Sequence, residues 1–362
     1  MVAALAQLNT LVLLALALKY PTDYRQNRDC KVSIQKLLVA GGCLRENGFE
    51  LGEGKYYGKA SLLVLDLQTG KFQSRLSKID GGKHYPSEHP NLQYTAPCLD
   101  GDTLWLPTDT EVYQYQLPEF KELKCFSHPC FQNIHSVHLF DNELIVTSTG
   151  IDNIVVLCPE SGEIKRIINT EGKNPWHRFS SEVDYRLIHS TRPHDAHPNY
   201  VFQLNNELWV TRCKQEDAVC LNNLDKRIDI SQGECISVHD GLWWGEKLAF
   251  TRVDGFLVIY DPISGKVLDK HDPFAKERNR PRGWCRGLHI DGDMFYIGYS
   301  KLRKTKLSAK LKFISQGNFK YRNGNEALVV AYNMRTKQVE GSYEFSSASI
   351  EAIYGILPYQ YD

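Results

Sequence analysis

One unit of four short apolar segments recurs along most of this 362-residue chain, and it constrains the fold more than any other feature. In each unit two segments flank a tight acidic or glycine turn, and the last two flank a turn such as Asp-x-x-Thr-Gly-Lys. Alternating apolar residues between such turns predict antiparallel β-hairpins. The expected second strands begin at Leu37, Leu104, Leu144, Leu208, Leu248 and Met294.

The spacing of the units predicts a closed ring. A four-stranded propeller blade takes roughly 40–50 residues. A first strand near Ile350 has no second strand after it, and the segment from Lys31 has no first strand before it. Joining the two completes one blade and removes the open sheet edges. The expected first strands begin near Tyr94, Ile134, Pro198, Cys235, Cys285 and Ile350, at steps of 40, 64, 37, 50 and 65 residues.

The chain therefore resembles the six-bladed β-propeller superfamily over residues 31–362. The resemblance is architectural, and it implies a central channel with ligands bound at one mouth, without implying an activity. We predict an all-β fold of six four-stranded antiparallel blades, closed by joining the C-terminal strand to the N-terminal blade. Residues 31–362 then form one propeller and residues 1–30 a peripheral segment.

Composition narrows the partners. Lys plus Arg and Asp plus Glu are 43 each, so no net charge recruits nucleic acid or an anionic membrane. The ten cysteines include no Cys-x-x-Cys pair, which favours reduced thiols in a cytoplasmic protein. The apolar run at residues 2–18 lacks a preceding positive charge and carries polar interruptions, so no membrane span is predicted. It is read as a short helix outside the fold, with a signal peptide and secretion as the alternative.

Connectivity predicts which face carries the function. In a propeller, the loop before each first strand and the loop between second and third strands open on the same face. The longest loops, residues 43–58, 176–193 and 301–325, all belong to this set. Long loops on a rigid scaffold are frequent binding sites. Residues 301–322 hold eight Lys or Arg and no acid, which is typical of a solvated loop, or of a funnel for an anionic substrate.

Histidines on the inner strands suggest a metal site. Aligned by their hairpin turns, the strands place His138, His239 and His289 at one level, with His197 as a further candidate ligand. Neutral imidazoles bind iron or zinc, and an open site leaves room for water or substrate. Carotenoid-cleaving oxygenases, which are also propellers, hold an axial iron in a similar geometry. This chain lacks their blade number and their fourth inner-strand histidine. The alternatives are a structural blade signature and acid–base work.

A second level suggests catalysis. Three residues earlier on the inner strands, His135, Asn199, Arg286 and Glu351 are polar and differ from blade to blade, with Ile236 as the blade-five residue. Such variety is typical of a binding site rather than a structural repeat. The loop Thr191-Arg-Pro-His-Asp-Ala-His-Pro enters the same mouth. The alternative for Arg286 and Glu351 is a buried ion pair. The predicted catalytic residues are His135, His194, Asn199, Arg286 and Glu351.

These patterns favour an enzyme acting on a small molecule, with an anionic substrate as one option, at the axial mouth of the propeller. A divalent metal, iron or zinc, is the candidate cofactor. The reaction class stays open between cyclase, lyase or hydrolase chemistry and oxygenase chemistry, because no nucleophile elbow, Walker loop or His-Glu-x-x-His motif is present. The alternative is a non-catalytic propeller that acts as a protein-binding scaffold or a ligand sensor.

Overall fold

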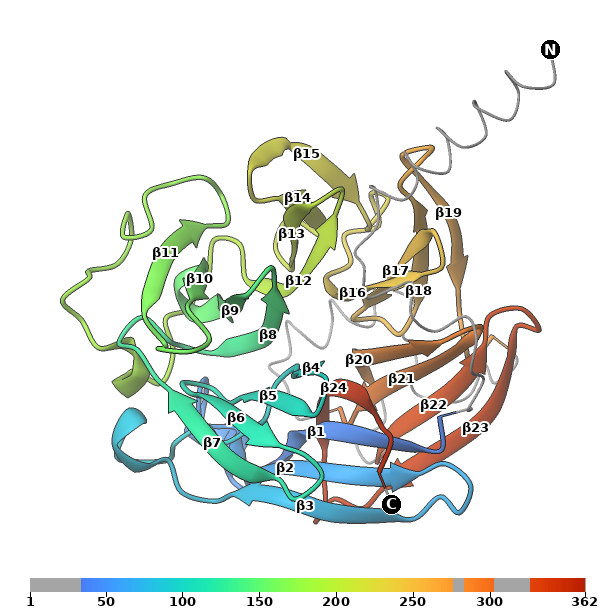
Figure 1. The fold of residues 1–362 in the computed structure, drawn as a ribbon, viewed down its shortest axis with the longest axis horizontal. Coiled ribbons are helices and arrows are strands. Elements are labelled where there is room, and N and C mark those ends of the chain that lie inside the picture. Colours follow the sequence, from blue (N-terminus) through green and yellow to red (C-terminus); the bar gives the residue numbers. More distant parts are fainter. Residues whose placement is uncertain (1–33, 276–282, 303–325, 362) are drawn as a thin grey trace.

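Six four-stranded antiparallel sheets surround a central axis in the computed structural model, which describes residues 34–275, 283–302 and 326–361 (Figure 1). Within these residues α2 (Gly48–Leu51) is the one α-helix, and η2 (Gly82–His84), η3 (Thr149–Ile151) and η4 (Tyr185–Leu187) are single 3₁₀ turns. The predicted all-β, six-bladed propeller is confirmed. The N-terminal segment 1–30 and residues 303–322 of the basic loop lie outside the described residues.

Each blade is one sheet whose four strands follow one another in sequence, except at the closure. The first three blades comprise β24 (Ala352–Tyr359), β1 (Lys36–Leu44), β2 (Tyr57–Asp66) and β3 (Phe72–Lys78); β4 (Cys98–Asp100), β5 (Thr103–Pro107), β6 (Val112–Gln116) and β7 (Lys121–Phe126); and β8 (Ile134–Phe140), β9 (Glu143–Ser148), β10 (Asn153–Leu157) and β11 (Ile164–Asn169).

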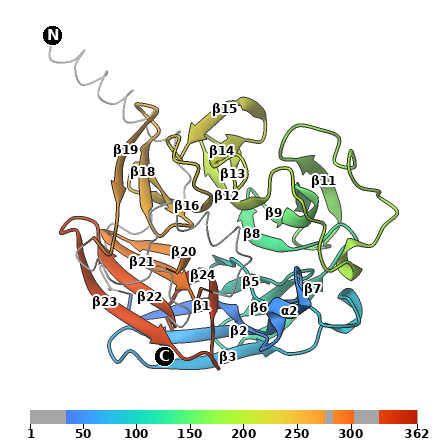
Figure 2. The ribbon, with the colours of Figure 1, turned by 180° about the vertical axis from the view of Figure 1, so that it is seen from behind.

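Blades four to six continue in the same order around the ring, as the view from behind also shows (Figure 2). They comprise β12 (Pro198–Leu204), β13 (Glu207–Arg212), β14 (Asp217–Cys220) and β15 (Asn223–Asp229); β16 (Val238–Trp244), β17 (Lys247–Arg252), β18 (Leu257–Asp261) and β19 (Lys266–His271); and β20 (Trp284–Asp291), β21 (Met294–Ser300), β22 (Ala327–Asn333) and β23 (Gln338–Phe345).

The ring closes as the repeat pattern predicts. Strand β24 pairs antiparallel with β1, so that Leu38 faces Leu357 and Ala40 faces Gly355. Val39 and Ile353 of this blade then share a buried cluster with Val329 of blade six. Burying apolar surface between neighbouring blades is the main stabilising contribution in such a ring. The C-terminal strand therefore supplies both an edge partner and part of the inter-blade core.

The core explains the sequence pattern within each blade. The third strand of blade three, β10, is buried along its whole length because neighbouring blades cover both of its faces. Strands covered on both faces are expected to be continuously apolar. The fourth strand, β11, carries exposed residues such as Lys165 and Arg166 because it lies at the outer rim. The inner strands alone can present polar side chains to the axis.

A β-bulge recurs on the inner strands of blades three to six. In blade three, Ile134 faces Ser148 and Val137 faces Val146, so two inner-strand residues oppose one residue of β9. The same irregularity interrupts β12, β16 and β20. A bulge bends its strand and re-aims a side chain, and bulges are frequent beside active sites. The first bulged residues are His135, Asn199, His239 and Arg286.

This register corrects the level assigned to His239. Counted from the hairpin pairs Phe140–Glu143 and Trp244–Lys247, His239 is equivalent to His135 and not to His138. The tripeptide Ser-Val-His, which ends at His138 in blade three and at His239 in blade five, suggested that these two histidines are equivalent. The blade-five tripeptide lies farther from its hairpin turn than the blade-three tripeptide does. His138 and His289 do share a level, where blade five places Leu242.

Two further features concern the cysteines and the helices of the described residues. The nine described cysteines are all free thiols. In the described part of the chain no helix is long and apolar enough to cross a membrane.

Candidate functional site

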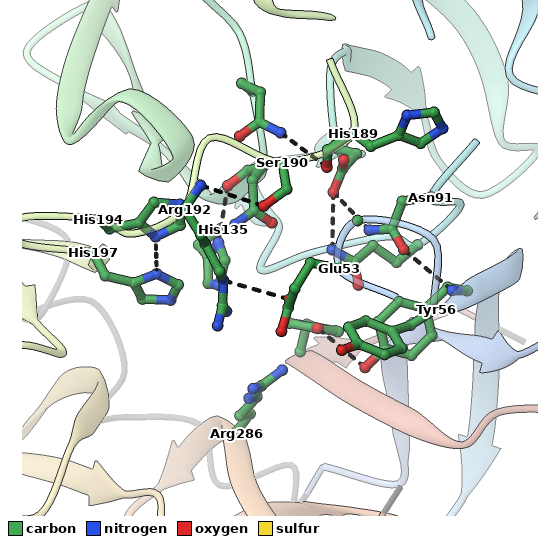
Figure 3. Close-up of a pocket in the computed structure, with 17 residues that line it drawn as sticks. Glu53, Tyr56, Asn91, His135, His189, Ser190, Arg192, His194, His197 and Arg286 are labelled. Carbon is green, nitrogen blue, oxygen red and sulfur yellow. Dashed lines mark hydrogen bonds and ion pairs between the residues drawn. The ribbon is translucent and has the colours of Figure 1, made fainter. Parts of the chain in front are cut away.

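A pocket that is open to solvent lies where the predicted loops meet the inner strands (Figure 3). Its walls come from blades one, two, three, four and six, so it lies at the axial mouth. The lining is polar almost throughout. The residues are Glu53, Gly54, Tyr56, Tyr57, Asn91, Gln93, Asp109, Gln132, Asn133, His135, His189, Ser190, Arg192, His194, His197, Arg286 and Tyr354.

The repeated bulges bring side chains of different blades into contact at the floor of the pocket. The ring of His135 lies 5.8 Å from the ring of His239 and 6.1 Å from that of Tyr354, measured between centroids. The guanidinium carbon of Arg286 lies 4.7 Å from the centroid of the same tyrosine ring. Tyr354 itself sits at the register irregularity of β24. Four blades therefore converge on one point of the axis.

Arg286 is a half-buried cation without an acidic partner among the described residues. Its guanidinium stacks on Tyr354 and lies 5.4 Å from the ring of Trp284. Its Nε makes no hydrogen bond, and no carboxylate of the described residues pairs with it. A buried charge without a partner is costly unless something else compensates it. An anionic ligand in the pocket would supply that compensation.

His135 is placed to act as a base. Its Nδ1 donates a hydrogen bond to the Asn133 carbonyl at 2.9 Å, so in the neutral ring Nε2 carries the free lone pair. Burial, together with the neighbouring His239, holds the pKa of His135 well below its ordinary value. The ring is therefore neutral at pH 7. A neutral imidazole with one fixed tautomer is the form that accepts a proton.

The blade-four loop adds a pair of stacked imidazoles. Nδ1 of His194 lies 2.6 Å from Nδ1 of His197, and the two rings are 4.8 Å apart. Burial lowers the pKa of His194 to about 3 and the pKa of His197 well below its ordinary value. The carboxylate of Asp152 holds this loop by accepting backbone N–H groups from three successive residues, Asp195, Ala196 and His197.

A buried carboxyl held by two side-chain amides of blade two forms another side of the pocket, and sequence analysis missed it. Nδ2 of Asn91 and Nε2 of Gln93 donate to the same carboxylate oxygen of Asp109, at 3.0 and 3.1 Å. Burial raises the pKa of Asp109 to about 7, although both amide hydrogen bonds act to lower it. The signal was present, because Asp109 lies between β5 and β6, in a loop of the predicted face.

A strap from blade one crosses the mouth. It is the β1–β2 connection, residues 45–56, and it meets the blade-four loop at two points. Glu53 pairs with Arg192 at 3.5 Å, and both side chains are well exposed. The backbone of Gly54 packs so closely against the His189 carbonyl that a Cβ would lie 1.7 Å from its oxygen. The strap therefore narrows the opening above Arg286 (Figure 3).

The pocket gathers some of the predicted residues and not others. His135, His194, His197 and Arg286 line it, whereas His138, Asn199, His239, His289 and Glu351 are not among its lining residues. Glu351 accepts hydrogen bonds from Lys301 Nζ at 2.9 Å and from the backbone N–H of Leu44 at 2.8 Å, so it pairs with Lys301 rather than with Arg286. Asn199 donates to the Val238 carbonyl and joins blade four to blade five.

The predicted metal ligands are dispersed. Among the described ranges no group of three or more His, Cys, Asp or Glu side chains is placed to hold a metal ion. His138 packs against Tyr200, with ring centroids 4.4 Å apart, and His289 stacks on Tyr296 at 6.1 Å. His239 lies one level away, beside His135. In this arrangement His138, His197, His239 and His289 do not fit one shared iron or zinc ion.

Gly298 lies opposite the bulge that carries Arg286, and it is the basis of a prediction. A Cβ there would lie 2.3 Å from the Arg286 carbonyl oxygen and 2.6 Å from Ile353. We expect Gly298→Ala to cost about 1–3 kcal/mol of stability, which is typical of overpacking. It will also shift the Arg286 backbone. Chemical denaturation measures the cost, and unchanged stability would contradict the close packing around Gly298.

The comparisons with known proteins identify the fold and no family. No family model matches the chain, and no curated protein matches it. A solved protein of unknown function from Bacteroides caccae is similar in structure, with a TM-score of 0.56 and 10% identity, over 90% of this chain and 99% of that one. A chain in a nidogen/laminin complex has a TM-score of 0.52 and 9% identity, over 88% and 97%. At these identities the likeness shows the fold alone: this chain is a six-bladed β-propeller.

Proposed function

We propose that the axial pocket binds a small polar anion and performs acid–base chemistry on it. The observation that carries the proposal is Arg286, a half-buried guanidinium that lines the pocket with no carboxylate partner among the described residues. Partly removing such a charge from water is unfavourable unless a counter-charge joins it. Arginine presents a planar fork of donors that matches carboxylate and phosphate oxygens.

The repeated bulge supports a binding role for this level. A purely structural device should carry the same residue in each blade, but the bulges of blades three to six carry His, Asn, His and Arg. Polar side chains that differ from blade to blade suit an asymmetric ligand. A small number of placed polar groups in a concave site is typical of small-molecule pockets.

His135 and Asp109 are the proposed base and acid. Nε2 of His135 would take a proton from one carbon of the bound anion, a C=C bond would form as the C–O bond at the adjacent carbon breaks, and the Asp109 carboxyl would protonate the departing oxygen. The two residues are neighbours across blades, since the N–H of Ile134 donates to the Asp109 carbonyl at 3.0 Å. A carboxyl whose pKa is about 7 is well matched to proton transfer near neutral pH. This elimination consumes no oxidant, so lyase chemistry is the class proposed.

The test is ligand binding followed by isotope exchange. Small organic acids and inorganic phosphate are screened for a rise in melting temperature, with the uncharged amide of each acid for comparison. We expect anions to stabilise the protein, their amides to have no effect, and Arg286→Gln to lose at least about tenfold in affinity, as for a charge-assisted hydrogen bond. Arg166→Gln removes one exposed charge of the outer rim and should change nothing.

Deuterium exchange then separates an enzyme from a sensor. A bound anion incubated in D₂O should lose the NMR signal of one C–H bond when His135 acts as a base. His135→Gln should bind the anion and show no exchange. Binding without exchange in the unaltered protein would favour the ligand-sensor alternative, and failure of every anion to bind in an Arg286-dependent way would refute the proposed site.

A protein-binding scaffold is the alternative from another class. One similar structure comes from a protein complex of nidogen and laminin, and that fact concerns the matched chain. A scaffold would bind its partner through the rim, so Arg286→Gln would leave the complex intact. The polar floor of the pocket is the reason that we prefer a small molecule.

A further inference from the structure

The pocket has two chemically distinct ends. Arg286 forms a cationic end on blade six, and Asp109 with Gln93 forms a hydrogen-bond-accepting end on blade two. Figure 3 shows Arg286 below the pocket, with Asn91 and Tyr56 to one side and His194 and His197 opposite them. No described Lys or Arg pairs with Asp109, so the two ends are not joined by an ion pair. A ligand that fills the pocket meets both.

The cationic end selects by geometry. Tyr354 and Trp284 lie within 4.7 and 5.4 Å of the Arg286 guanidinium carbon, so aromatic rings occupy its surroundings and hold it in place. Its Nε–H has no acceptor. Tyr354 also forms a side-chain hydrogen bond with the guanidinium, and the remaining donors lie along the edge of its plane. Two parallel N–H groups on that edge match the two oxygens of a carboxylate.

The charge of the pocket favours a monoanion over a phosphate. Arg192 is already paired with Glu53, and the buried rings of His135, His194 and His197 are neutral near pH 7. Arg286 is thus the one uncompensated cation among the lining residues. A phosphate monoester carries a charge of about −1.5 to −2 at pH 7 and would exceed it. A carboxylate matches it.

The other end calls for hydroxyl groups. The side-chain amide of Gln93 donates to Asp109, while its own oxygen is buried with no partner in the described structure. The carboxylate of Asp109 uses one oxygen for both amide donors and lines the pocket. Because one hydrogen bond joins the side chains of Gln93 and Asp109, their remaining oxygens lie close together. Two adjacent acceptor oxygens suit the O–H donors of a vicinal diol.

We infer that the ligand is a polyhydroxylated carboxylic acid of sugar-acid size, with its carboxylate on Arg286 and its hydroxyls on Gln93 and Asp109. The inference rests on the proposed anion site and adds the class of molecule. Tyr56, Tyr57 and Tyr354 line the same pocket and provide aromatic rims for the C–H faces of a sugar ring.

Calorimetry with ring-matched probes tests the inference. The probes are D-glucuronate, D-galacturonate and D-mannuronate, with D-glucose lacking the carboxylate and cyclohexanecarboxylate lacking the hydroxyls. We expect at least one uronate to bind at least about tenfold more tightly than either control. Arg286→Lys, which keeps the charge and loses the fork, and Gln93→Leu should each weaken that uronate about tenfold. Arg166→Gln serves as the unaffected variant.

Each other outcome has a defined meaning. Equal, Arg286-dependent binding of cyclohexanecarboxylate and the uronates would overturn the hydroxyl requirement and leave the anion site in place. Binding of inorganic phosphate alone, again lost in Arg286→Lys, would overturn the carboxylate assignment and leave the anion site. Tight binding of an uncharged sugar, unaffected by Arg286→Lys, would overturn the inference and the proposed function together.

Discussion

Asp152→Ala will lower the free energy of unfolding by about 3–6 kcal/mol, because it removes the acceptor of three buried backbone N–H groups at once. The carboxylate of Asp152 is fully buried, and one oxygen accepts from Ala196 and His197 at 3.0 and 2.7 Å. The other accepts from Asp195 at 2.8 Å and from Arg178 at 3.2 Å. A buried donor left without an acceptor costs about 1–3 kcal/mol.

The same substitution should release the pocket wall. The three N–H groups belong to the loop that carries His194 and His197, so their rings will lose their fixed stacking. Urea denaturation measures stability, and the histidine ring signals in NMR report the loop. Asp152→Asn is the matched variant: it retains one oxygen, and we expect it to lose about half as much. Unchanged stability and unchanged histidine signals in Asp152→Ala would contradict the role given to this carboxylate.

The fold was predictable because its determinants are local and repeated. Strands such as Leu144-Ile-Val-Thr and Leu248-Ala-Phe-Thr recur with hairpin turns between them, and each copy adds to the same conclusion. The closure followed from two incomplete units at the two ends of the chain, and β24 pairs with β1 as expected. The order of the strands also predicted the face that carries the site. The loops before the first strands and the loops between second and third strands all open on that face.

The position of each inner-strand side chain along the central axis was less predictable. A β-bulge shifts the strand register, and no residue pattern in the sequence marks it. Ser-Val-His occurs at the inner strands of both blade three and blade five, but the two copies are placed differently relative to the bulge. His138 lies beyond the bulge of its strand, whereas His239 lies within it. Structural alignment needs the cross-strand partner, and that partner is known only once the hairpin is folded.

The blade-two end of the site was missed for a different reason. Asp109 stands in a Thr-Asp-Thr-Glu turn, which in a sequence is typical of an exposed acidic loop. Its burial is created by Asn91 and Gln93, which come from the connection before β4. A carboxylate becomes chemically unusual when tertiary structure removes water from it, and no local pattern records that event.

Asp109→Asn will stabilise the protein by up to about 4 kcal/mol above neutral pH and by almost nothing near pH 4. Burial raises the pKa of Asp109 from 3.8 to about 7 in the folded protein. Between pH 3.8 and pH 7 the folded state holds a proton that the unfolded state has released. The free energy of unfolding therefore falls by about 1.4 kcal/mol for each pH unit. Above pH 7 the folded protein carries the full cost of a buried carboxylate.

An asparagine at this position never ionises, and its oxygen can still accept from Asn91 and Gln93. The difference in unfolding free energy between Asp109→Asn and the unaltered protein should therefore grow from pH 4 to pH 7 and then stay level. Denaturation at a series of pH values measures it, with Asp225→Asn at an exposed position of β15 as the comparison whose difference stays flat. A flat difference for Asp109→Asn as well would mean that Asp109 ionises freely in the fold. In that event Asp109 loses its role as the acid, while Arg286 and His135 remain a binding site without a proton donor.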